Sequence, residues 1–393
     1  MKHLHVIRSL DPKQGGPVEA IRQLIPSMRE AGHETEVVTL DDATAPWLDK
    51  LGIPVHALGP ARGRYGFAAR LVPWLRQHHQ EYAALIVRGL WQYHGFGTWR
   101  ALRHSNVPYF VFTHGMLDPW YRRQYPSKHI KKWAYWAAIE HRVLQDARGV
   151  LFTSEEERVL ARGAFRPYNC NQIVVNYGTS APRGNAETQR SHFFHHYPAL
   201  RNKRLILCMG RVHPKKGCDL LVEAFARVLA DKQEWHLIIA GPDELCTQEK
   251  LVRLADSLKI AHRVTWTGML AGEMKWGALR AAEAFALASH SENFGIVVAE
   301  ALACGLPVLI SNKVNIWREI LADRAGIVAD DTLRGTESLL LDWYRLGPTE
   351  RATMQANART CFITRFHIER AAASLIDAIS GSQMRRAAVS QTA

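Results

Sequence analysis

Disulfide and metal-binding cysteine patterns are missing from this sequence. Its six cysteines are scattered along 393 residues, and no two of them form a Cys-x-x-Cys pair. Several stand in apolar runs, where a reduced cysteine packs as a small apolar side chain. The cysteines therefore exclude a disulfide-stapled secreted scaffold and favour a reducing, cytoplasmic compartment.

Long apolar runs are missing as well. No stretch approaches the roughly 20 apolar residues that cross a bilayer, and the first residues, MKHLHVIRSL, carry too short an apolar run for a signal peptide. Low-complexity segments and short-period repeats are also absent from the sequence. We therefore expect neither an integral membrane protein nor a repeat protein.

Acidic residues are fewer than basic ones. The chain has 50 Lys and Arg against 37 Asp and Glu, which gives a net charge of +13 and a pI of about 9.6. Such a charge attracts nucleic acid, a phosphate-bearing substrate or a membrane surface, and the charge alone does not choose between them. The composition, 47% hydrophobic and 22% charged, is that of a globular protein, and the length suits two domains of roughly 150 to 200 residues.

Short apolar runs alternate with helical patterns along the whole chain. Continuously apolar strands separated by amphipathic helices indicate parallel sheets that are covered on both faces. The sequence therefore predicts an α/β, doubly wound fold. The first expected strands are LHVIRSL (4–10), TEVVTL (35–40), ALIVRG (84–89), YFVFTH (109–114), GVLFTS (149–154) and QIVVNY (172–177).

This pattern lapses between Gly178 and Asn202, where polar residues, proline and glycine gather. We place a domain boundary there. We expect an N-terminal Rossmann-like domain at 1–180, a C-terminal one at 181–365, and at 366–393 a helix and polar tail that pack back toward the N-terminal domain. The later expected strands are RLILCMG (204–210), HLIIAG (236–241), VTWTGM (264–269), EAFALAS (283–289), PVLIS (307–311) and GIVAD (326–330).

Ligands of doubly wound sheets bind beyond the carboxyl ends of the strands, so the residues just after each strand are the informative ones. After the first strand, Gly15 and Gly16 precede Pro17 at the start of a helix that runs to about Ala31. Glycines let a ligand approach the backbone, and helix N-terminal amides favour an anion, so a phosphate site is one interpretation. A flexible turn with proline at the first helical position is the other.

Two cations follow the strand at 204–210. Arg211 comes directly after it, and Lys216 stands five residues on, before a helix that begins near Gly217. A guanidinium binds oxygens bidentately and an ammonium adds a compact charge, which together suit a diphosphate. A solvated basic loop is the alternative.

Two carboxylates lie in the stretch SENFGIVVAEALACG. A loop carries Glu292, Asn293, Phe294 and Gly295, and the short helix after it carries Glu300. A carboxylate on such a helix can accept hydrogen bonds from the vicinal hydroxyls of a ribose, while the loop carboxylate meets sugar hydroxyls nearby. Two ordinary surface acids are the alternative. The apolar surroundings oppose it, because a buried carboxylate is costly without a partner, and Glu300 would need one.

One histidine, His114, ends the strand at 109–114. A lone histidine is usually structural or exposed. At the carboxyl end of a strand in this fold, however, it can contact a reacting group. The residues alone leave both roles open.

Taken together, these stretches resemble the family 4 retaining glycosyltransferases of the GT-B fold, often called group 1 glycosyltransferases. The most specific parts are the E-x7-E of Glu292 to Glu300 with the following EALACGLPVLIS, and the GRxxxxKG of Gly210 to Gly217. The early GG-helix-AGHE and the later VVNYGTS agree in order and spacing. The likeness covers nearly the whole chain, and it implies two Rossmann-like domains that face each other across a cleft.

The resemblance also implies roles for these residues. Gly15 and Gly16 are expected beside the donor phosphates across that cleft, and His114 is expected to reach the sugar from the N-terminal domain. Arg211 and Lys216 are expected to stabilise the leaving diphosphate.

Further roles fall on the two carboxylates and the loop between them. Glu300 is expected to bind the ribose hydroxyls and Glu292 to contact the transferred sugar. Asn293, with the backbone of Phe294 and Gly295, is expected near the sugar and phosphate.

The implied reaction is the transfer of a hexosyl group from a nucleotide-diphosphate sugar, UDP- or GDP-linked, with retention of anomeric configuration. Bond breaking builds a negative diphosphate, which fixed positive groups and helix amides stabilise. We expect no cofactor and no metal, and the sequence has no Asp-x-Asp, the usual manganese clamp of the other major glycosyltransferase fold. In front-face attack a β-phosphate oxygen accepts the acceptor's proton, so no side chain is assigned as nucleophile.

The stretch at 120–136 holds five Lys or Arg, six aromatics and no acid. This composition suits an anionic membrane interface. With HGMLDPW before it, which is similar to segments of exopolysaccharide and O-antigen transferases, it leads us to expect a saccharide acceptor, a lipid-linked intermediate of bacterial surface polysaccharide, at the inner face of the plasma membrane. A helix with its tryptophans packed inward and its lysines solvated stays open as the alternative.

Other enzymes of the same fold are the nearest rivals: a soluble disaccharide or glycogen-type synthase, or a sugar-nucleotide epimerase. The pairing of GRxxxxKG with E-x7-E opposes the epimerase, and the basic aromatic stretch opposes a soluble small-sugar acceptor. A basic nucleic-acid-binding protein is the rival from another class. We expect no nucleic-acid partner, because no such binding module is recognisable and the basic residues are dispersed outside 120–136.

Overall fold

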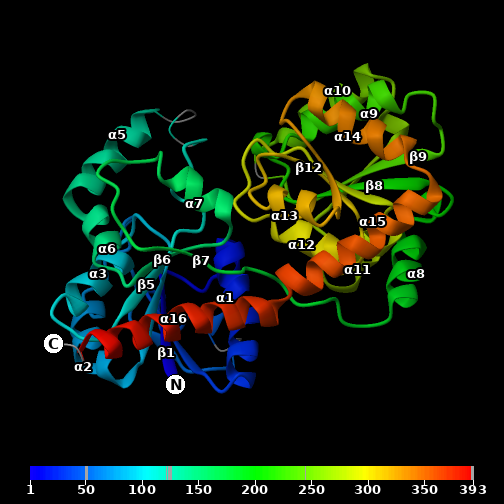
Figure 1. The fold of residues 1–393 in the computed structure, drawn as a ribbon. Coiled ribbons are helices and arrows are strands. Elements are labelled where there is room, and N and C mark those ends of the chain that lie inside the picture. The colour runs from blue at the N-terminus through cyan, green and yellow to red at the C-terminus, as the bar shows by residue number, and fades with distance from the viewer. Residues whose placement is uncertain (49–51, 121, 123–125, 244, 391–393) are drawn as a thin grey trace. The chain divides into compact units, whose positions relative to one another are not determined.

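The computed structural model describes residues 1–48, 52–120, 122, 126–243 and 245–390. The chain forms two compact units (Figure 1). Unit 1 comprises Met1–Gly178 together with Ile368–Ala393, and unit 2 comprises Thr179–His367.

Seven parallel strands of the described residues form the sheet of unit 1, in the order β3-β2-β1-β4-β5-β6-β7. Residues such as Leu4, Val6, Ile86 and Phe110 are fully buried, as expected for a sheet covered on both faces. The expected strands are confirmed, and β3 is an addition: its three half-buried residues carry no apolar run that could have predicted it. The strands are β1 Lys2–Ile7, β2 Glu34–Thr39, β3 Val55–Ala57, β4 Ala84–Arg88, β5 Tyr109–Phe112, β6 Gly149–Phe152 and β7 Gln172–Val174.

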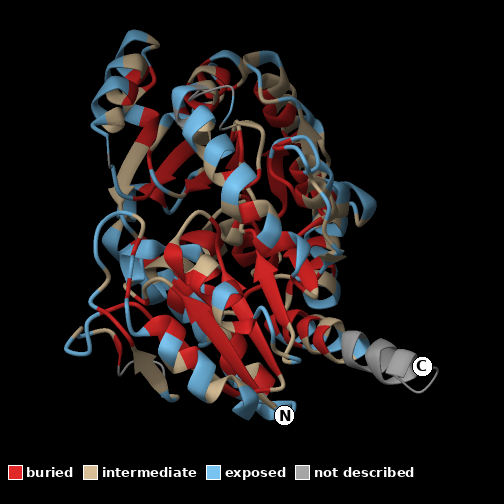
Figure 2. Cartoon of the chain, turned by 90° about the vertical axis from the view of Figure 1, so that its left-hand side faces the viewer, coloured by how far each residue is buried: buried red, intermediate tan, exposed pale blue. Residues whose placement is uncertain are grey.

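Helices cover both faces of this sheet (Figures 1 and 2). On one face α2, α3 and α6 enclose a core that includes Leu75, Trp99 and Leu144. On the other face α1 and the C-terminal α16 contribute Leu24 and Leu375 to a second core. The helices are α1 Gly16–Glu30, α2 Leu71–His78, α3 Tyr93–Leu102, α5 Pro126–Tyr135, α6 His141–Gln145, α7 Glu155–Ala161 and α16 Ile368–Ser390, with the 3-10 turns η1 Pro12–Gln14 and η3 His79–Glu81 and the π-helix η4 Trp136–Glu140.

Unit 2 repeats the plan with six parallel strands of the described residues, in the order β10-β9-β8-β11-β12-β13. Its core holds Leu237 and Leu309 from the strands, with Phe225 and Trp343 from the covering helices. The strands are β8 Arg204–Met209, β9 Trp235–Ala240, β10 Val264–Gly268, β11 Ala284–Leu287, β12 Val308–Ser311 and β13 Gly326–Ala329. The helices are α8 Ala186–His196, α9 Cys218–Val228, α10 Thr247–Ser257, α11 Gly272–Ala281, α12 Ile296–Ala303, α13 Trp317–Ala322, α14 Leu333–Arg345 and α15 Pro348–Cys361, with η5 Pro198–Leu200, η6 Pro214–Lys216, η7 Ala261–Arg263 and the π-helix η8 Phe362–Phe366.

The polar interval after Gly178 is not a bare linker, because it contains α8. Asn185 caps this helix, its side-chain oxygen accepting hydrogen bonds from the amides of Glu187 and Thr188. Phe193 and Gln189 face inward and are fully buried. This helix has a weak apolar pattern in the sequence, because a glutamine takes one of its core positions.

The order of the strands fixes where ligands can bind. In unit 1 the chain order reverses between β1 and β4, and in unit 2 it reverses between β8 and β11. In open parallel sheets the crevice for ligands lies at such a switch point, beyond the carboxyl ends of the strands. The predicted doubly wound fold is thus confirmed in both units, with one switch point in each.

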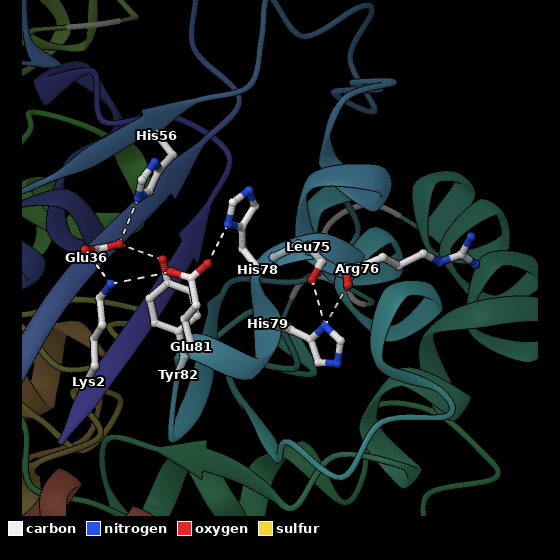
Figure 3. A network of polar contacts seen from close by, with 9 residues as sticks. All are labelled: Lys2, Glu36, His56, Leu75, Arg76, His78, His79, Glu81 and Tyr82. Carbon is white, nitrogen blue, oxygen red and sulfur yellow. Dashed lines mark hydrogen bonds and ion pairs between the residues drawn. The ribbon is translucent and has the colours of Figure 1, made fainter.

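A network of bonded polar groups lies among the first strands of unit 1 (Figure 3). The Glu36 carboxylate accepts from the Tyr82 hydroxyl at 2.6 Å, lies 2.8 Å from His56 Nε2 and pairs with the Lys2 ammonium at 2.9 Å. Burial alone would raise the pKa of Glu36, but Tyr82, His56 and Lys2 together lower that pKa to about 2. The network ties the edge strand β3 and its neighbour β2 to the start of β1.

Candidate functional site

The switch point of unit 2 brings the basic loop after β8 against the end of β11. Gly217, which precedes α9, has a φ of 62°, and a Cβ there would lie 2.1 Å from the carbonyl oxygen of Ala288. Only glycine fits so close an approach of two backbones. The loop thereby presents Lys216, half-buried, and Arg211, exposed, at the carboxyl edge of the sheet.

Lys216 and Glu292 form an ion pair across this junction. Their side chains are 13% and 20% exposed, so water screens the pair only partly. The backbone of Glu292 is fixed too: its amide donates to the Lys313 carbonyl at 2.8 Å, and its carbonyl accepts from the Asn315 amide at 3.0 Å. The structure therefore places a predicted cation and a predicted acid in direct contact.

Glu292 is ionised in this arrangement. Burial by itself would raise its pKa, but the Lys216 ammonium, with smaller contributions from Lys215 and Arg211, holds the pKa below its ordinary value. Arg211 is thus close enough to act on the same carboxylate. The basic loop and the acidic loop form one electrostatic unit.

The second carboxylate, Glu300, has its own cation. Its side chain is 8% exposed, and one carboxylate oxygen accepts from the Lys275 ammonium of α11 at 2.7 Å. The Lys275 ammonium also lies 4.4 Å from the centre of the Trp276 ring. The partner that burial of Glu300 requires is therefore Lys275, a residue that the sequence did not single out.

The turn between the two acids is built from glycine and a buried aromatic. Gly295, the N-cap of α12, has a φ of 72°, and a Cβ there would approach the Glu292 Cγ and a Val298 methyl at 3.2 Å each. Phe294 is 5% exposed and packs edge-on against Phe366, with ring centres 5.6 Å apart. The Phe294 side chain is therefore buried, and the half-buried Asn293 precedes it in the loop.

In unit 1, Gly15 and Gly16 begin the long helix α1, as predicted. Gly15 has a φ of 76°, and no atom would lie within 4 Å of a Cβ there, so its requirement is conformational rather than steric. The Tyr177 hydroxyl donates to the Gly16 carbonyl at 3.4 Å. The Tyr177 ring also meets the edge of the His114 ring at 6.1 Å between centres. Tyr177 thus joins two predicted site features.

His114 follows β5 in a left-handed conformation, with a φ of 47°. Its ring stacks on Phe112, with centres 5.3 Å apart. Burial, and then the charge of Arg88, lower the pKa of His114 to about 3, so the ring is neutral at pH 7. A neutral imidazole can donate or accept a hydrogen bond at a reacting group without adding charge.

A buried carboxylate holds the backbone beside His114. Glu157 Oε1 accepts from the Thr113 hydroxyl at 2.5 Å and from the Gly115 amide at 2.6 Å. Its Oε2 accepts from the Thr153 amide and hydroxyl, each at 2.7 Å. Four donors therefore anchor the loops after β5 and β6 to the start of α7.

The side chains of the basic aromatic stretch at 120–136 differ in how far they are exposed. Residues 121 and 123–125 lie outside the described residues. Of the rest, Trp136 is buried and donates to the Pro167 carbonyl at 2.8 Å, whereas Ile130 and Trp133 are 70% and 52% exposed. Among the described residues no helix is both long and apolar enough to span a bilayer.

Sequence reasoning missed three residues of these switch points: Arg88, Tyr177 and Lys275. Arg88 carried a signal, since it is a charge at the carboxyl end of the apolar run ALIVRG. Tyr177 stood in the resembling VVNYGTS without an assigned role. Lys275 carried none, because a lysine on an amphipathic helix is ordinary.

The fold and the two switch points are those of a GT-B protein. A protein of Anabaena, HepE, solved with UDP and glucose, has a TM-score of 0.75 at 19% identity, over 97% of this chain and 100% of that one. Sucrose-phosphate synthase of Thermosynechococcus elongatus has a TM-score of 0.72 at 18% identity, over the full length of both chains. At these identities the likeness concerns the fold.

Sequence comparison gives the family. The model described as glycosyl transferases group 1 matches residues 191–360, and that of the glycosyl transferase 4-like domain matches 15–178. D-inositol 3-phosphate glycosyltransferase of Gordonia bronchialis is 32% identical over 166 residues, which are 40% of this chain and 36% of that protein's length. The chain belongs to the group 1 glycosyltransferases, and the predicted family and fold are confirmed.

Proposed function

We propose that this chain transfers a hexosyl group from a nucleotide-diphosphate sugar to a saccharide acceptor, with retention of anomeric configuration. The observation that carries the proposal is the contact of Lys216 with Glu292 at the switch point of unit 2, with Arg211 beside them and the buried Glu300 on the next helix. Because HepE was solved with UDP, a uridine nucleotide is the first donor to test, followed by a guanosine one.

The roles follow from the chemistry of each group. Glu300 accepts hydrogen bonds from the ribose hydroxyls, with Lys275 holding the carboxylate in place. Glu292 contacts hydroxyls of the transferred sugar. Arg211 and Lys216 stabilise the charge that builds on the leaving diphosphate.

The remaining predicted residues complete the site. Asn293 and the backbone of Phe294 and Gly295 bind sugar and phosphate. In unit 1 the loop at Gly15 and Gly16 is assigned to phosphate and the neutral His114 to sugar.

The proposed chemistry assigns no protein nucleophile and no metal. The leaving diphosphate's own oxygen accepts the acceptor's proton while fixed cations neutralise the diphosphate. Transfer should therefore continue in EDTA. A loss of activity in EDTA that Mn²⁺ or Mg²⁺ restores would overturn this part of the proposal.

Release of nucleoside diphosphate from a panel of UDP-, GDP- and ADP-sugars tests the function. One donor should release its diphosphate when bacterial membrane lipid extract supplies the acceptor. Glu292→Gln should reduce that release strongly, and NMR of the product should show the donor's anomeric configuration. Inversion, or no release from any donor with any acceptor fraction, would contradict the proposal.

We further propose that the acceptor is lipid-linked and is reached at the inner face of the plasma membrane through α5. Ile130 and Trp133 project from this helix beside the exposed Lys131, the combination that suits an anionic interface.

Flotation with anionic liposomes tests the surface. The wild type should float at low salt and be released at high salt. The double variant Ile130→Ser, Trp133→Ser should lose most binding, while Ile363→Ser, which removes a 51% exposed apolar side chain of unit 2, should not. Absence of binding at low salt would rule the surface out.

A further inference from the structure

Arg88 is a buried cation without a counter-charge. It is the last residue of β4, at the switch point of unit 1, and is 3% exposed. Its Nη1 and Nη2 atoms are both shielded from solvent and have no hydrogen-bond partner among the described residues. No carboxylate of the described chain pairs with it. A guanidinium keeps its charge in proteins, and an unpaired buried charge is costly, so this arrangement calls for an anion from outside the chain.

The side chains in contact with Arg88 carry no charge. Arg88 Nε lies 3.2 Å from His5 Nδ1, and because arginine only donates, that nitrogen of His5 must be an unprotonated acceptor. The guanidinium carbon lies 4.3 Å from the centre of the Phe112 ring, on which His114 also stacks. Glu157, the buried acid that anchors the loops after β5 and β6, has both oxygens occupied by four other donors.

The same cluster reaches the positive end of α1. His114 contacts Tyr177, whose hydroxyl bonds the Gly16 carbonyl at the first turn of that helix. Helix N-termini attract anions, and the switch point is where this sheet type binds its ligands. Three independent features therefore coincide: an uncompensated guanidinium, the start of a long helix and the reversal of strand order.

We propose that Arg88 receives a phosphate or diphosphate group of a substrate at the switch point of unit 1. This inference deepens the proposed function and rests on it in naming a substrate phosphate. A planar guanidinium with two bare terminal nitrogens matches two oxygens of a phosphate bidentately. Because those nitrogens are covered in the ligand-free chain, the half-buried Tyr177 is the side chain that we expect to move on binding.

The test uses the full chain and two probes, inorganic phosphate and pyrophosphate. Binding is followed by calorimetry and by the shift of the melting temperature, for wild type and for Arg88→Met, each also in a Lys216→Met background that removes a competing cation of unit 2. Arg88→Met should weaken binding about tenfold to a hundredfold, the value of hydrogen bonds to a charged group. Its melting temperature without anion should equal or exceed that of wild type, because an uncompensated charge has been removed.

A matched control separates this role from a structural one. Arg263 is also 3% exposed and lies over a phenylalanine, but its Nη1 donates to the Leu229 and Lys232 carbonyls at 2.8 Å each. Arg263→Met should lower the melting temperature and leave anion binding unchanged. If Arg88→Met behaves in the same way, Arg88 is structural and the inference is wrong.

A conservative variant keeps the test open if Arg88→Met does not fold. Arg88→Lys retains the charge but loses the bidentate fork, so it should bind pyrophosphate several-fold more weakly than wild type does. Unchanged binding by Arg88→Lys would contradict the inference.

The source of the phosphate is resolved by adding UDP and GDP. If Arg88→Met loses affinity for the nucleotide as well as for pyrophosphate, the group is the donor's diphosphate. If only the inorganic anions are affected, it is a phosphate of the acceptor.

The same data separate this inference from the proposed function. If Glu300→Gln weakens nucleotide binding but Arg88→Met leaves anion binding unchanged, the inference about Arg88 is wrong and the proposed function stands. Anion binding that depends on Arg88, without binding of any nucleotide or nucleotide sugar, would sink the proposed function alone.

Discussion

The two switch points of this protein balance charge in opposite ways. At the switch point of unit 2 the two predicted acids each pair with a lysine of the same unit: Glu292 with Lys216 and Glu300 with Lys275. In unit 1 the buried Arg88 has no acid partner among the described residues. The two acids at the carboxyl edge of unit 2 are paired with lysines, while Arg88 at the carboxyl edge of unit 1 keeps an unpaired positive charge.

The difference teaches what each edge can bind. A neutralised, hydrogen-bonded set is already oriented, so it can exchange one partner for sugar and ribose hydroxyls at small cost. A buried cation without a partner is instead stabilised when it binds an anion. The pairing pattern thus predicts hydroxyl recognition in unit 2 and anion recognition in unit 1, in addition to the diphosphate at the basic loop.

Breaking the pair in unit 2 should have the largest effect. Lys216→Ala removes a positioned cation from the diphosphate and leaves Glu292 beside weaker partners, so turnover should fall about a hundredfold to a thousandfold. Steady-state release of nucleoside diphosphate measures it. Lys313→Ala, an exposed lysine of the neighbouring loop, is the control and should stay near wild type. Equal turnover in both variants would contradict the role of Lys216.

A second variant tests whether the loops after β5 and β6 in unit 1 depend on the hydrogen bonds of Glu157. Glu157→Gln presents an amide donor to a site lined by donors, so the free energy of unfolding should drop by about 2 to 3 kcal/mol. Chemical denaturation measures the loss. Glu30→Gln, an exposed acid at the end of α1, should change stability by less than about 0.5 kcal/mol. A stable Glu157→Gln would mean that the loop beside His114 is held by other contacts.

The smallest effect is expected at the amino ends of the strands of unit 1, opposite the carboxyl edge that holds Arg88. Glu36, near the amino ends of the strands, has its pKa lowered from 4.5 to about 2. Because the pKa is lower in the folded state, this group contributes stability above pH 4.5 that is lost as the pH falls through 2.

Glu36→Gln should therefore cost about 2 kcal/mol at pH 7 and flatten the acid dependence between those two values. Unfolding titrations at several pH values check this. Glu34→Gln, an exposed acid on the same strand, should leave the acid dependence as it is. An unchanged profile in Glu36→Gln would show that the network of Figure 3 adds no stability.

Much of the fold and part of the site could be predicted from the sequence, for a physical reason. Parallel strands buried on both faces must be apolar throughout, so the sequence shows where each strand ends. Lys216, Glu292 and His114 stand at or just after such carboxyl ends. The edge strand β3 was not predicted, because an edge strand needs no apolar run. The helix α8 was not predicted, because its buried face includes the polar Gln189.

The partners of the site residues could not be predicted. Lys275 reaches Glu300 from another helix, and no spacing in the sequence records that meeting. Arg88 was visible as a charge in an apolar run, but its lack of a counter-charge is a fact of three dimensions. Sequence locates the groups after each strand, while packing decides which charges are balanced.

The central claim is that Glu300, held by Lys275, binds the donor nucleotide in unit 2. Calorimetric titration of UDP, GDP and ADP into wild type and Glu300→Gln tests it most directly. The control is Glu283→Gln, whose carboxylate pairs with Arg204 just before β11, at the opposite edge of the sheet. One nucleotide should bind wild type and Glu283→Gln alike and should bind Glu300→Gln at least about tenfold more weakly. Equal affinity of that nucleotide for wild type and Glu300→Gln would contradict the account.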